Sequence, residues 1–158
     1  MTAWSIRAVE WNDPAGAALR DAQKHEVNTV FYPDFDDTEP GTKPSADDIA
    51  VFYVAFAGEQ PVACGGLRPL GSDYGEVKRM YVDPAFRGRG LSSAILSALE
   101  SDARSRGWSR VLLETGDRMT PARRFYEREG YRRIEPFGPY TDSELSICYE
   151  KVLTPGAR

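Results

Sequence analysis

The chain has 158 residues and a mass of 17.6 kDa, the size of one domain. Hydrophobic residues make up 41% and charged residues 28%, which excludes collagen, coiled-coil, disordered and membrane-spanning classes. The net charge of −4 argues against nucleic acid as the main partner. This charge is divided unevenly, because residues 1–75 carry a net −7 and residues 76–158 a net +3. The first part suits a cationic partner and the second an anionic one.

The N-terminal part is predicted to contain a strand, a helix and a long loop. Residues 5–11 alternate as in a strand, and a helix is expected over about 14–30, capped by Asn12 or Asp13. The apolar face expected for this helix consists of Ala18, Leu19, Ala22 and Val27. Segment 32–48 holds three prolines and six acidic residues, which is typical of an irregular, exposed loop. A loop of this length is often a binding lid or partly disordered.

Strands and helices alternate through the rest of the chain. Strands are expected at 49–56, 61–70, 76–82, 110–115, 131–137 and 145–153. Helices are expected from Leu91 to Gly107 and from Thr120 to Gly130, where a glycine ends each one. The last two strands form a hairpin. We therefore predict one mixed α+β domain over 1–158, with a mostly antiparallel central sheet flanked by helices.

Two cysteines, Cys64 and Cys148, lie in predicted strands. They form neither a disulfide framework nor a zinc pattern, and we interpret them as small buried hydrophobic residues in a reducing cytosol. The N-terminus lacks the charged and apolar blocks of a signal peptide, and no stretch approaches the ~20 apolar residues of a membrane span. We therefore predict a cytoplasmic protein that has no metal site and no membrane partner.

The strongest local signal is a strand end, a glycine-rich turn and a helix start between residues 82 and 93. Unpaired N–H groups and the positive dipole end at a helix start attract anions. The glycines let the backbone approach a pyrophosphate, the arginines add charge, and the serines add hydroxyl donors. The residues concerned are Arg87, Gly88, Arg89, Gly90, Leu91, Ser92 and Ser93. The pattern is neither a dinucleotide fingerprint nor a P-loop, and by itself it also fits a glycine-stabilised turn.

Two motifs in this half resemble those of the GNAT superfamily of acetyl-CoA-dependent N-acetyltransferases. The signature [Q/R]-x-x-G-x-[G/A] is matched by Arg87, Gly90 and Ser92, with serine in place of the final Gly or Ala. The second motif, Ala-x-x-[Leu/Phe]-Tyr-x-x-x-Gly-[Phe/Tyr], is matched by Ala122, Phe125, Tyr126, Gly130 and Tyr131. The resemblance covers about residues 49–153 and implies the GNAT acyl-CoA N-acyltransferase fold.

The resemblance also implies that acetyl-CoA is the co-substrate, bound by about residues 76–153. The backbone of Met80, Tyr81 and Val82 would bind the pantetheine arm like an added strand. A backbone N–H of this stretch would polarise the thioester carbonyl. The pyrophosphate would lie over residues 87–93.

Two residues are the expected catalytic pair. Tyr126 matches the family's tyrosine that donates a proton toward the coenzyme A sulfur, although it also fits a core aromatic residue. Glu76 lies where some members place a general-base glutamate, although it also fits an ion-pair partner or a strand start. Strand alternation predicts one shared face for Glu76, Lys78, Met80 and Val82. Met119 stands where many relatives have Asn, so a backbone group, Arg118 or Thr120 is expected to replace that contact.

These motifs predict an N-acetyltransferase that moves an acetyl group from acetyl-CoA to a primary amine by direct attack in a ternary complex. Residues 1–75 would supply the acceptor side, and the acidic loop 32–48 favours a cationic acceptor, either a small molecule or a protein amine. A homodimer is compatible with the family. Two alternatives stay open: a non-catalytic coenzyme A binding or sensing module, and an acyltransferase for another acyl-CoA or a hydroxyl acceptor.

Overall fold

The computed structural model describes residues 3–36 and 40–154. Its strands are β1 (Trp4–Ala8), β2 (Val51–Ala57), β3 (Gln60–Pro69), β4 (Tyr74–Val82), β5 (Arg110–Gly116), β6 (Arg132–Ile134) and β7 (Ser146–Val152). Its α-helices are α1 (Pro14–Glu26), α2 (Leu91–Ser105) and α3 (Thr120–Arg128). Shorter helical turns are η1 (Val27–Phe31), η2 (Ala46–Asp48), η3 (Pro84–Phe86) and η4 (Gly138–Asp142).

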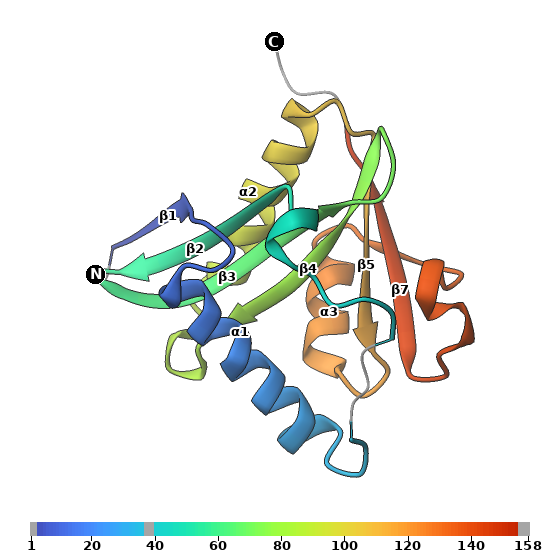
Figure 1. The fold of residues 1–158 in the computed structure, drawn as a ribbon, viewed down its shortest axis with the longest axis horizontal. Helices are drawn as coiled ribbons and strands as arrows, with labels where there is room; N and C mark the ends of the chain where they lie inside the picture. Colours follow the sequence, from blue (N-terminus) through green and yellow to red (C-terminus); the bar gives the residue numbers. More distant parts are fainter. Residues whose placement is uncertain (1–2, 37–39, 155–158) are drawn as a thin grey trace.

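The seven strands form one sheet in the order β1-β2-β3-β4-β5-β7-β6. Every neighbouring pair is antiparallel except β4–β5, which is parallel. Helix α1 lies on one face of the sheet, and α2 and α3 lie on the other (Figure 1). The mixed α+β class, the mostly antiparallel sheet and the final hairpin of β6 with β7 are therefore confirmed.

The first helix begins as predicted but buries a different face. The Asp13 carboxylate accepts a hydrogen bond from the Ala15 N–H at 3.0 Å, which caps α1. The buried residues of α1 are Gly16 and Leu19, whereas Ala18 of the expected apolar face is exposed. Gly16 has no Cβ, so the Phe52 ring of β2 lies directly against its backbone. The close contact at Gly16 therefore sets the rotation of the helix about its axis. A pattern of hydrophobic residues does not predict such a contact, because glycine has no apolar side chain.

Two apolar clusters hold the helices to the sheet. On the α2 side the cluster includes Ile95, Leu96, Leu99, Val77, Val82, Leu113 and Tyr126. On the α1 side it includes Trp11, Leu19, Phe52, Val54, Phe56 and Cys64. A fully buried Leu, Val or Phe side chain contributes about 1.5–3 kcal/mol, so these clusters hold the helices around the site. No helix among residues 3–36 and 40–154 has both the length and the apolar character of a membrane span.

Strand β4 contains a bulge that the strand pattern did not predict. Arg79 has φ +62°, an unusual conformation for a residue other than glycine. Lys78 pairs with Gly66 of β3, but Tyr81 pairs with Cys64, so two β4 residues oppose one residue of β3. Such a bulge inserts one residue and reverses the side-chain alternation that follows.

The single shared face predicted for residues 76–82 is therefore wrong. Met80 and Val82 pack with Val77 on the α2 side of the sheet. Glu76 and Lys78 lie on the α1 side, because they alternate with Val77 before the bulge. The bulge thus separates Glu76 from the part of β4 that was expected to bind the pantetheine arm.

The parallel pair in the middle of the sheet is short. Residues Tyr74–Glu76 of β4 pair with Arg110–Leu112 of β5, and beyond this point the described residues of the two strands do not pair. The strands diverge there, and one edge of β4 is left open. Both cavities described below lie in this opening.

Candidate active site

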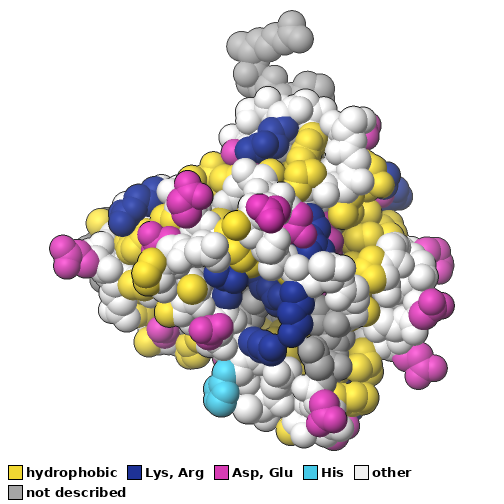
Figure 2. Space-filling view, in the orientation of Figure 1, with side chains coloured by type: hydrophobic (Ala, Val, Ile, Leu, Met, Phe, Trp, Pro, Cys, Tyr) yellow, Lys and Arg dark blue, Asp and Glu magenta, His cyan; other side chains and the backbone are white. Residues whose placement is uncertain are grey.

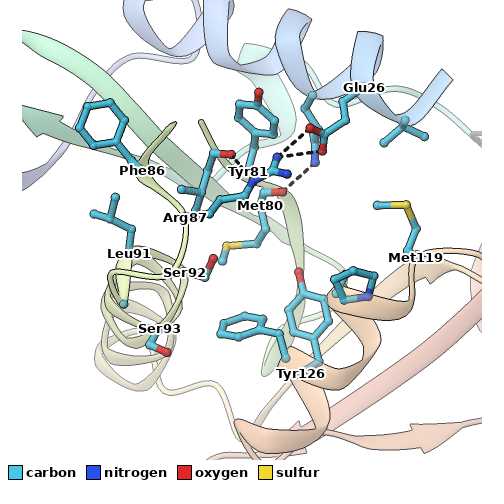
Figure 3. Close-up of a pocket in the computed structure, with 18 of the residues that line it drawn as sticks. Glu26, Met80, Tyr81, Phe86, Arg87, Leu91, Ser92, Ser93, Met119 and Tyr126 are labelled. Carbon is cyan, nitrogen blue, oxygen red and sulfur yellow. Dashed lines mark hydrogen bonds and ion pairs between the residues drawn. The ribbon is translucent and has the colours of Figure 1, made fainter. Parts of the chain in front are cut away.

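A cavity of about 400 Å³ opens between β4 and α3, with α1 and η1 along one side and the start of α2 along the other (Figure 3). Ten residues expected from the sequence line it: Met80, Tyr81, Val82, Arg87, Gly88, Gly90, Leu91, Ser92, Ser93 and Tyr126. Further lining residues are Gln23, Glu26, Val27, Phe31, Phe86, Met119, Pro121, Ala122, Phe125 and Arg128. The structure thus brings together segments that are far apart in the chain.

The start of α2 forms an anion cradle at one end of this cavity. Gly90 has φ +83° as the residue before the helix, and no heavy atom lies within 4 Å of the position that a Cβ would take. A residue with a side chain would be strained in this conformation and would fill that space. The N–H groups of the first helical turn, at Leu91, Ser92 and Ser93, are without intrahelical partners, as at any helix start. This geometry is suited to a phosphate group.

Arg87 is held at the mouth of the cradle by Glu26. One guanidinium nitrogen of Arg87 lies 2.8 Å from both carboxylate oxygens of Glu26, and its Nε donates to the Val82 carbonyl at 3.0 Å. Figure 3 shows this ion pair crossing the cavity from α1 to the loop before α2. An anion that enters the cradle therefore meets an arginine that already has an acidic partner.

Two residues expected in the site lie outside this cavity. The Arg89 guanidinium lies over the Phe86 ring, 5.2 Å from its centroid, and does not line the cavity. Glu76 is 2% exposed and lines neither cavity. Its Oε2 accepts a hydrogen bond from the Tyr140 hydroxyl at 2.6 Å and lies 3.6 Å from the Lys78 ammonium.

Tyr126 projects from α3 into the opening. Figure 3 shows its hydroxyl pointing across the cavity toward Met80 of β4. The ring packs on Tyr131 and Tyr149, at centroid distances of 5.8 and 6.4 Å. Burial raises the pKa of Tyr126, and the charge of Glu114 raises it further. The hydroxyl therefore stays protonated at neutral pH, as a proton donor must.

A second cavity of about 150 Å³ adjoins the first, and Gln23, Val27 and Met119 line both. Its remaining lining residues are Lys24, Asn28, Tyr32, Val77, Lys78, Arg79, Glu114, Thr115, Gly116 and Leu145. They come from α1, η1, β4, β5 and the segment before β7. A molecule in this second cavity would therefore lie next to one held along β4.

Gln23 stands at the junction of the two cavities. Its Nε2 donates to the Met80 carbonyl at 2.8 Å, which fixes the orientation of its amide group. Its Oε1 is buried and has no hydrogen-bond partner. A buried acceptor without a partner is costly, so this oxygen is placed to accept from a ligand N–H group.

The start of the 32–48 loop is fastened to the segment after β5. The Arg118 guanidinium donates to both carboxylate oxygens of Asp34, at 2.6 and 3.0 Å. Tyr32 donates to Asp117 Oδ1 at 2.6 Å and accepts from the Arg118 N–H at 3.0 Å. Gly116 permits this approach because a Cβ there would overlap the Tyr32 ring. The Arg118 guanidinium, considered above as a replacement for the missing Asn, binds the start of this loop through Asp34.

Several lining residues were not expected from the sequence. Gln23, Glu26 and Val27 have i, i+3 and i+4 spacing, which places them on one face of the first helix. Their mixed polarity does not by itself indicate a site, although their spacing is a usable signal. Glu114 gave no comparable signal, because a single acidic residue in a strand has no pattern.

Comparisons with known proteins agree with this geometry. Residues 10–131 match the Acetyltransferase (GNAT) family. The chain belongs to the GNAT acetyltransferase family. It is 39% identical over 103 residues to the IAA acetyltransferase of Azospirillum brasilense, an alignment that spans 65% of this chain and 67% of that protein.

Solved structures of this family share the fold. One is a proposed acyl-CoA N-acyltransferase from Klebsiella pneumoniae, with a TM-score of 0.82 and 28% identity over 98% of this chain and all of that one. Another is a GNAT acetyltransferase from Elizabethkingia anophelis with acetyl-CoA bound, with a TM-score of 0.68 and 16% identity over 95% of this chain and 98% of that one. The latter supports the fold alone. No group of three or more His, Cys, Asp and Glu residues in the described ranges is arranged to hold a metal ion.

Proposed function

We propose that this GNAT family member transfers the acetyl group of acetyl-CoA to a primary amine by direct attack in a ternary complex. The observation that carries the proposal is the pair of adjoining cavities. The larger holds the anion cradle and Tyr126, and the smaller is lined by polar and charged side chains. Membership of the GNAT acetyltransferase family supports the choice of acetyl-CoA as donor.

In this proposal the donor occupies the larger cavity. Its pyrophosphate binds the N–H groups at the start of α2, where Gly88 and Gly90 leave space. Its pantetheine arm lies along residues Met80–Val82, on the edge of β4 that β5 leaves open. The thioester then lies between Met80 and the Tyr126 hydroxyl, next to the junction with the smaller cavity.

The reaction needs a neutral amine and a protonated leaving group. The amine nitrogen forms a bond to the thioester carbonyl carbon, the C–S bond breaks, and coenzyme A leaves as its thiolate. Tyr126 donates a proton to this sulfur. The attacking amine loses one proton as the amide forms, so the number of protons is conserved. An acetyl-enzyme is not required. Burial raises the pKa of Cys64 to about 12 and that of Cys148 to about 11, so neither thiol is a good nucleophile at neutral pH.

The proton on the incoming ammonium has two candidate acceptors. We propose Glu76 as the base, acting through water, with its carboxylate held by the Tyr140 hydroxyl that donates to it at 2.6 Å and by the Lys78 ammonium 3.6 Å away. Lys78 lines the smaller cavity, so the Glu76 carboxylate lies one side chain behind its wall. Glu114 is the competing candidate, because it is the carboxylic acid among the residues that line the smaller cavity.

An amine screen with detection of free coenzyme A thiol tests the proposal. We expect thiol release that depends on the amine, together with formation of the N-acetyl product by mass spectrometry. A sensing module would bind acetyl-CoA but release no thiol with any amine. An acyltransferase of another class would respond to other acyl-CoA donors or to alcohols. Glu76→Gln and Glu114→Gln are then compared. The base is the residue whose substitution lowers kcat by about 10²-fold or more.

Two further properties of the protein are also proposals. The cytoplasmic location is supported by Cys64 and Cys148, which are free thiols in the structure, as expected in a reducing compartment. The homodimer stays a prediction that light scattering tests.

A further inference from the structure

We infer that Met119 and Val27 form the wall against which the acyl group of the donor packs, and that this wall restricts the donor to acetyl-CoA. The inference rests on the proposed function and deepens it by naming the residues that set the length of the transferred acyl group. It is drawn from the position of the two side chains between the cavities, from their apolar character, and from the charged lining beyond them.

Three described residues line both cavities and mark the boundary between them: Gln23, Val27 and Met119. Gln23 is a fixed part of this boundary, because its Nε2 donates to the Met80 carbonyl at 2.8 Å. Val27 and Met119 complete the boundary with apolar side chains, and both residues are partly buried. In Figure 3 the Met119 side chain extends from the start of α3 toward α1. The boundary between the two cavities therefore has an apolar part.

The acyl group is the end of the donor that reaches this boundary. In the proposed complex the pyrophosphate lies at the start of α2, and the thioester lies between Met80 and the Tyr126 hydroxyl. The residues that line both cavities come next along the same direction. The methyl of the acetyl group is apolar, so it is removed from water most favourably against the side chains of Met119 and Val27.

A longer acyl chain has no comparable place beyond this wall. Charged side chains line the smaller cavity, namely those of Lys24, Lys78, Arg79 and Glu114. On the face shown in Figure 2, Lys and Arg side chains gather near the centre, beside α1. A methylene group placed among such side chains would disturb their polar contacts, which costs free energy. It would also take up part of the about 150 Å³ that the acceptor needs.

An added methylene group therefore needs space that the side chain of residue 119 now fills. The backbone of Met119 is held in place, because its N–H donates to the Gly116 carbonyl at 3.0 Å and its carbonyl accepts from the Arg123 N–H at 2.9 Å. A substitution here changes the wall and leaves these backbone contacts. Met119→Ala removes the side chain beyond Cβ and opens this space, whereas Met119→Leu keeps most of the volume.

Acyl-CoA donors of increasing length test the inference with the full chain. Acetyl-CoA, propionyl-CoA and butyryl-CoA are compared at a fixed concentration of one amine that the amine screen identifies, and thiol release gives kcat/KM for each donor. The wild type should prefer acetyl-CoA to propionyl-CoA by about tenfold or more, since one methylene group in an apolar pocket changes kcat/KM by roughly 10–200-fold. Any change that affects the amine alone cancels in this ratio of donors.

Substitutions test whether the named wall causes the preference. Met119→Ala should lower the preference for acetyl-CoA over propionyl-CoA by about tenfold, and Met119→Leu should retain it. Val27→Ala should lower the preference by a smaller factor, and it provides a second test from another element, because alanine is well suited to a helical segment. Leu70→Ala is the matched control, because it removes an exposed apolar side chain beyond the end of β3.

The outcomes separate this inference from the proposed function. If the wild type uses propionyl-CoA as well as acetyl-CoA, the inference is overturned while transfer to an amine stands. If Met119→Ala and Val27→Ala lower kcat/KM by the same factor with every donor, these side chains do not pack against the acyl group, and the inference is again overturned. If no amine of any kind releases thiol with any donor, the proposed function itself fails.

Discussion

The ion pair between Glu26 and Arg87 should compete with acetyl-CoA. Arg87 lies at the mouth of the anion cradle, and one of its guanidinium nitrogens contacts both oxygens of Glu26 at 2.8 Å. A pyrophosphate bound at the start of α2 would draw on the same guanidinium. Glu26→Gln removes the acidic competitor and keeps the shape of the side chain, so we expect acetyl-CoA to bind more tightly.

The size of this effect follows from how exposed the pair is. The side chains of Arg87 and Glu26 are 45% and 23% exposed, so water screens their attraction. Exposed or partly exposed ion pairs contribute about 0.2–1 kcal/mol. Removing the competitor should therefore lower the Kd for acetyl-CoA by a factor of about 1.4–5. The difference should shrink as salt concentration rises, because salt screens charges at this exposure.

Isothermal titration calorimetry of acetyl-CoA against the wild type and Glu26→Gln provides the assay. Glu59→Gln is the matched control, because it removes the same charge from the exposed turn between β2 and β3. Weaker binding in Glu26→Gln than in Glu59→Gln would refute the reasoning. It would show that Glu26 positions Arg87 for the phosphate rather than competing with it.

Three further predictions concern other parts of the molecule. Tyr126→Phe should lower kcat by about 10²-fold and leave the Kd for acetyl-CoA unchanged, and an unaltered kcat in initial-rate assays would remove Tyr126 from the chemistry. Arg118→Ala should free the loop held through Asp34 and raise KM for the acceptor more than KM for acetyl-CoA; an equal rise in both would contradict a role confined to the acceptor cavity. Arg132 and then Arg110 hold the pKa of Glu150 below its ordinary value of 4.5, so this carboxylate stabilises the fold above that pH, and the contribution is lost as pH falls through the lowered pKa. Urea titrations should therefore show a smaller loss of the free energy of unfolding between neutral and acidic pH in Glu150→Gln than in the wild type. An identical loss would show that the ion pairs of Glu150 with these two arginines do not contribute to stability.

Much of the fold could be predicted because its elements carry local signals. The helix start at Leu91 follows a glycine turn, and the strands of the central sheet show apolar runs bounded by turns. The bulge at Arg79 could not be predicted, since arginine gives no sign of a positive φ. Because of this bulge, Met80 lies on the α2 side of the sheet, whereas Glu76 lies on the α1 side.

The candidate site was predictable where it is local in sequence. The cradle at residues 87–93 is continuous, and all but Arg89 of its residues line the larger cavity. The smaller cavity was not predictable, because its lining combines residues of α1, β4 and β5, such as Lys24, Lys78 and Glu114. The charge division between the two halves of the chain reflects contacts within the fold as well as binding partners. Acidic residues of the first half bind arginines of the fold, as Glu26, Asp34 and Asp48 do.

The most direct test of the central claim is thermal unfolding with acetyl-CoA, followed by the same measurement on Ala122→Trp. Ala122 lines the larger cavity, and a Trp there would obstruct it. A ligand at 100 times its Kd stabilises the folded state by about 2.7 kcal/mol, which raises Tm by about 5–11 °C in a domain of this size. We predict a rise of this order in the wild type and none in the folded Ala122→Trp variant. An unchanged wild-type Tm at millimolar acetyl-CoA, or an equal rise in both proteins, would contradict the assignment of the larger cavity to the acetyl donor.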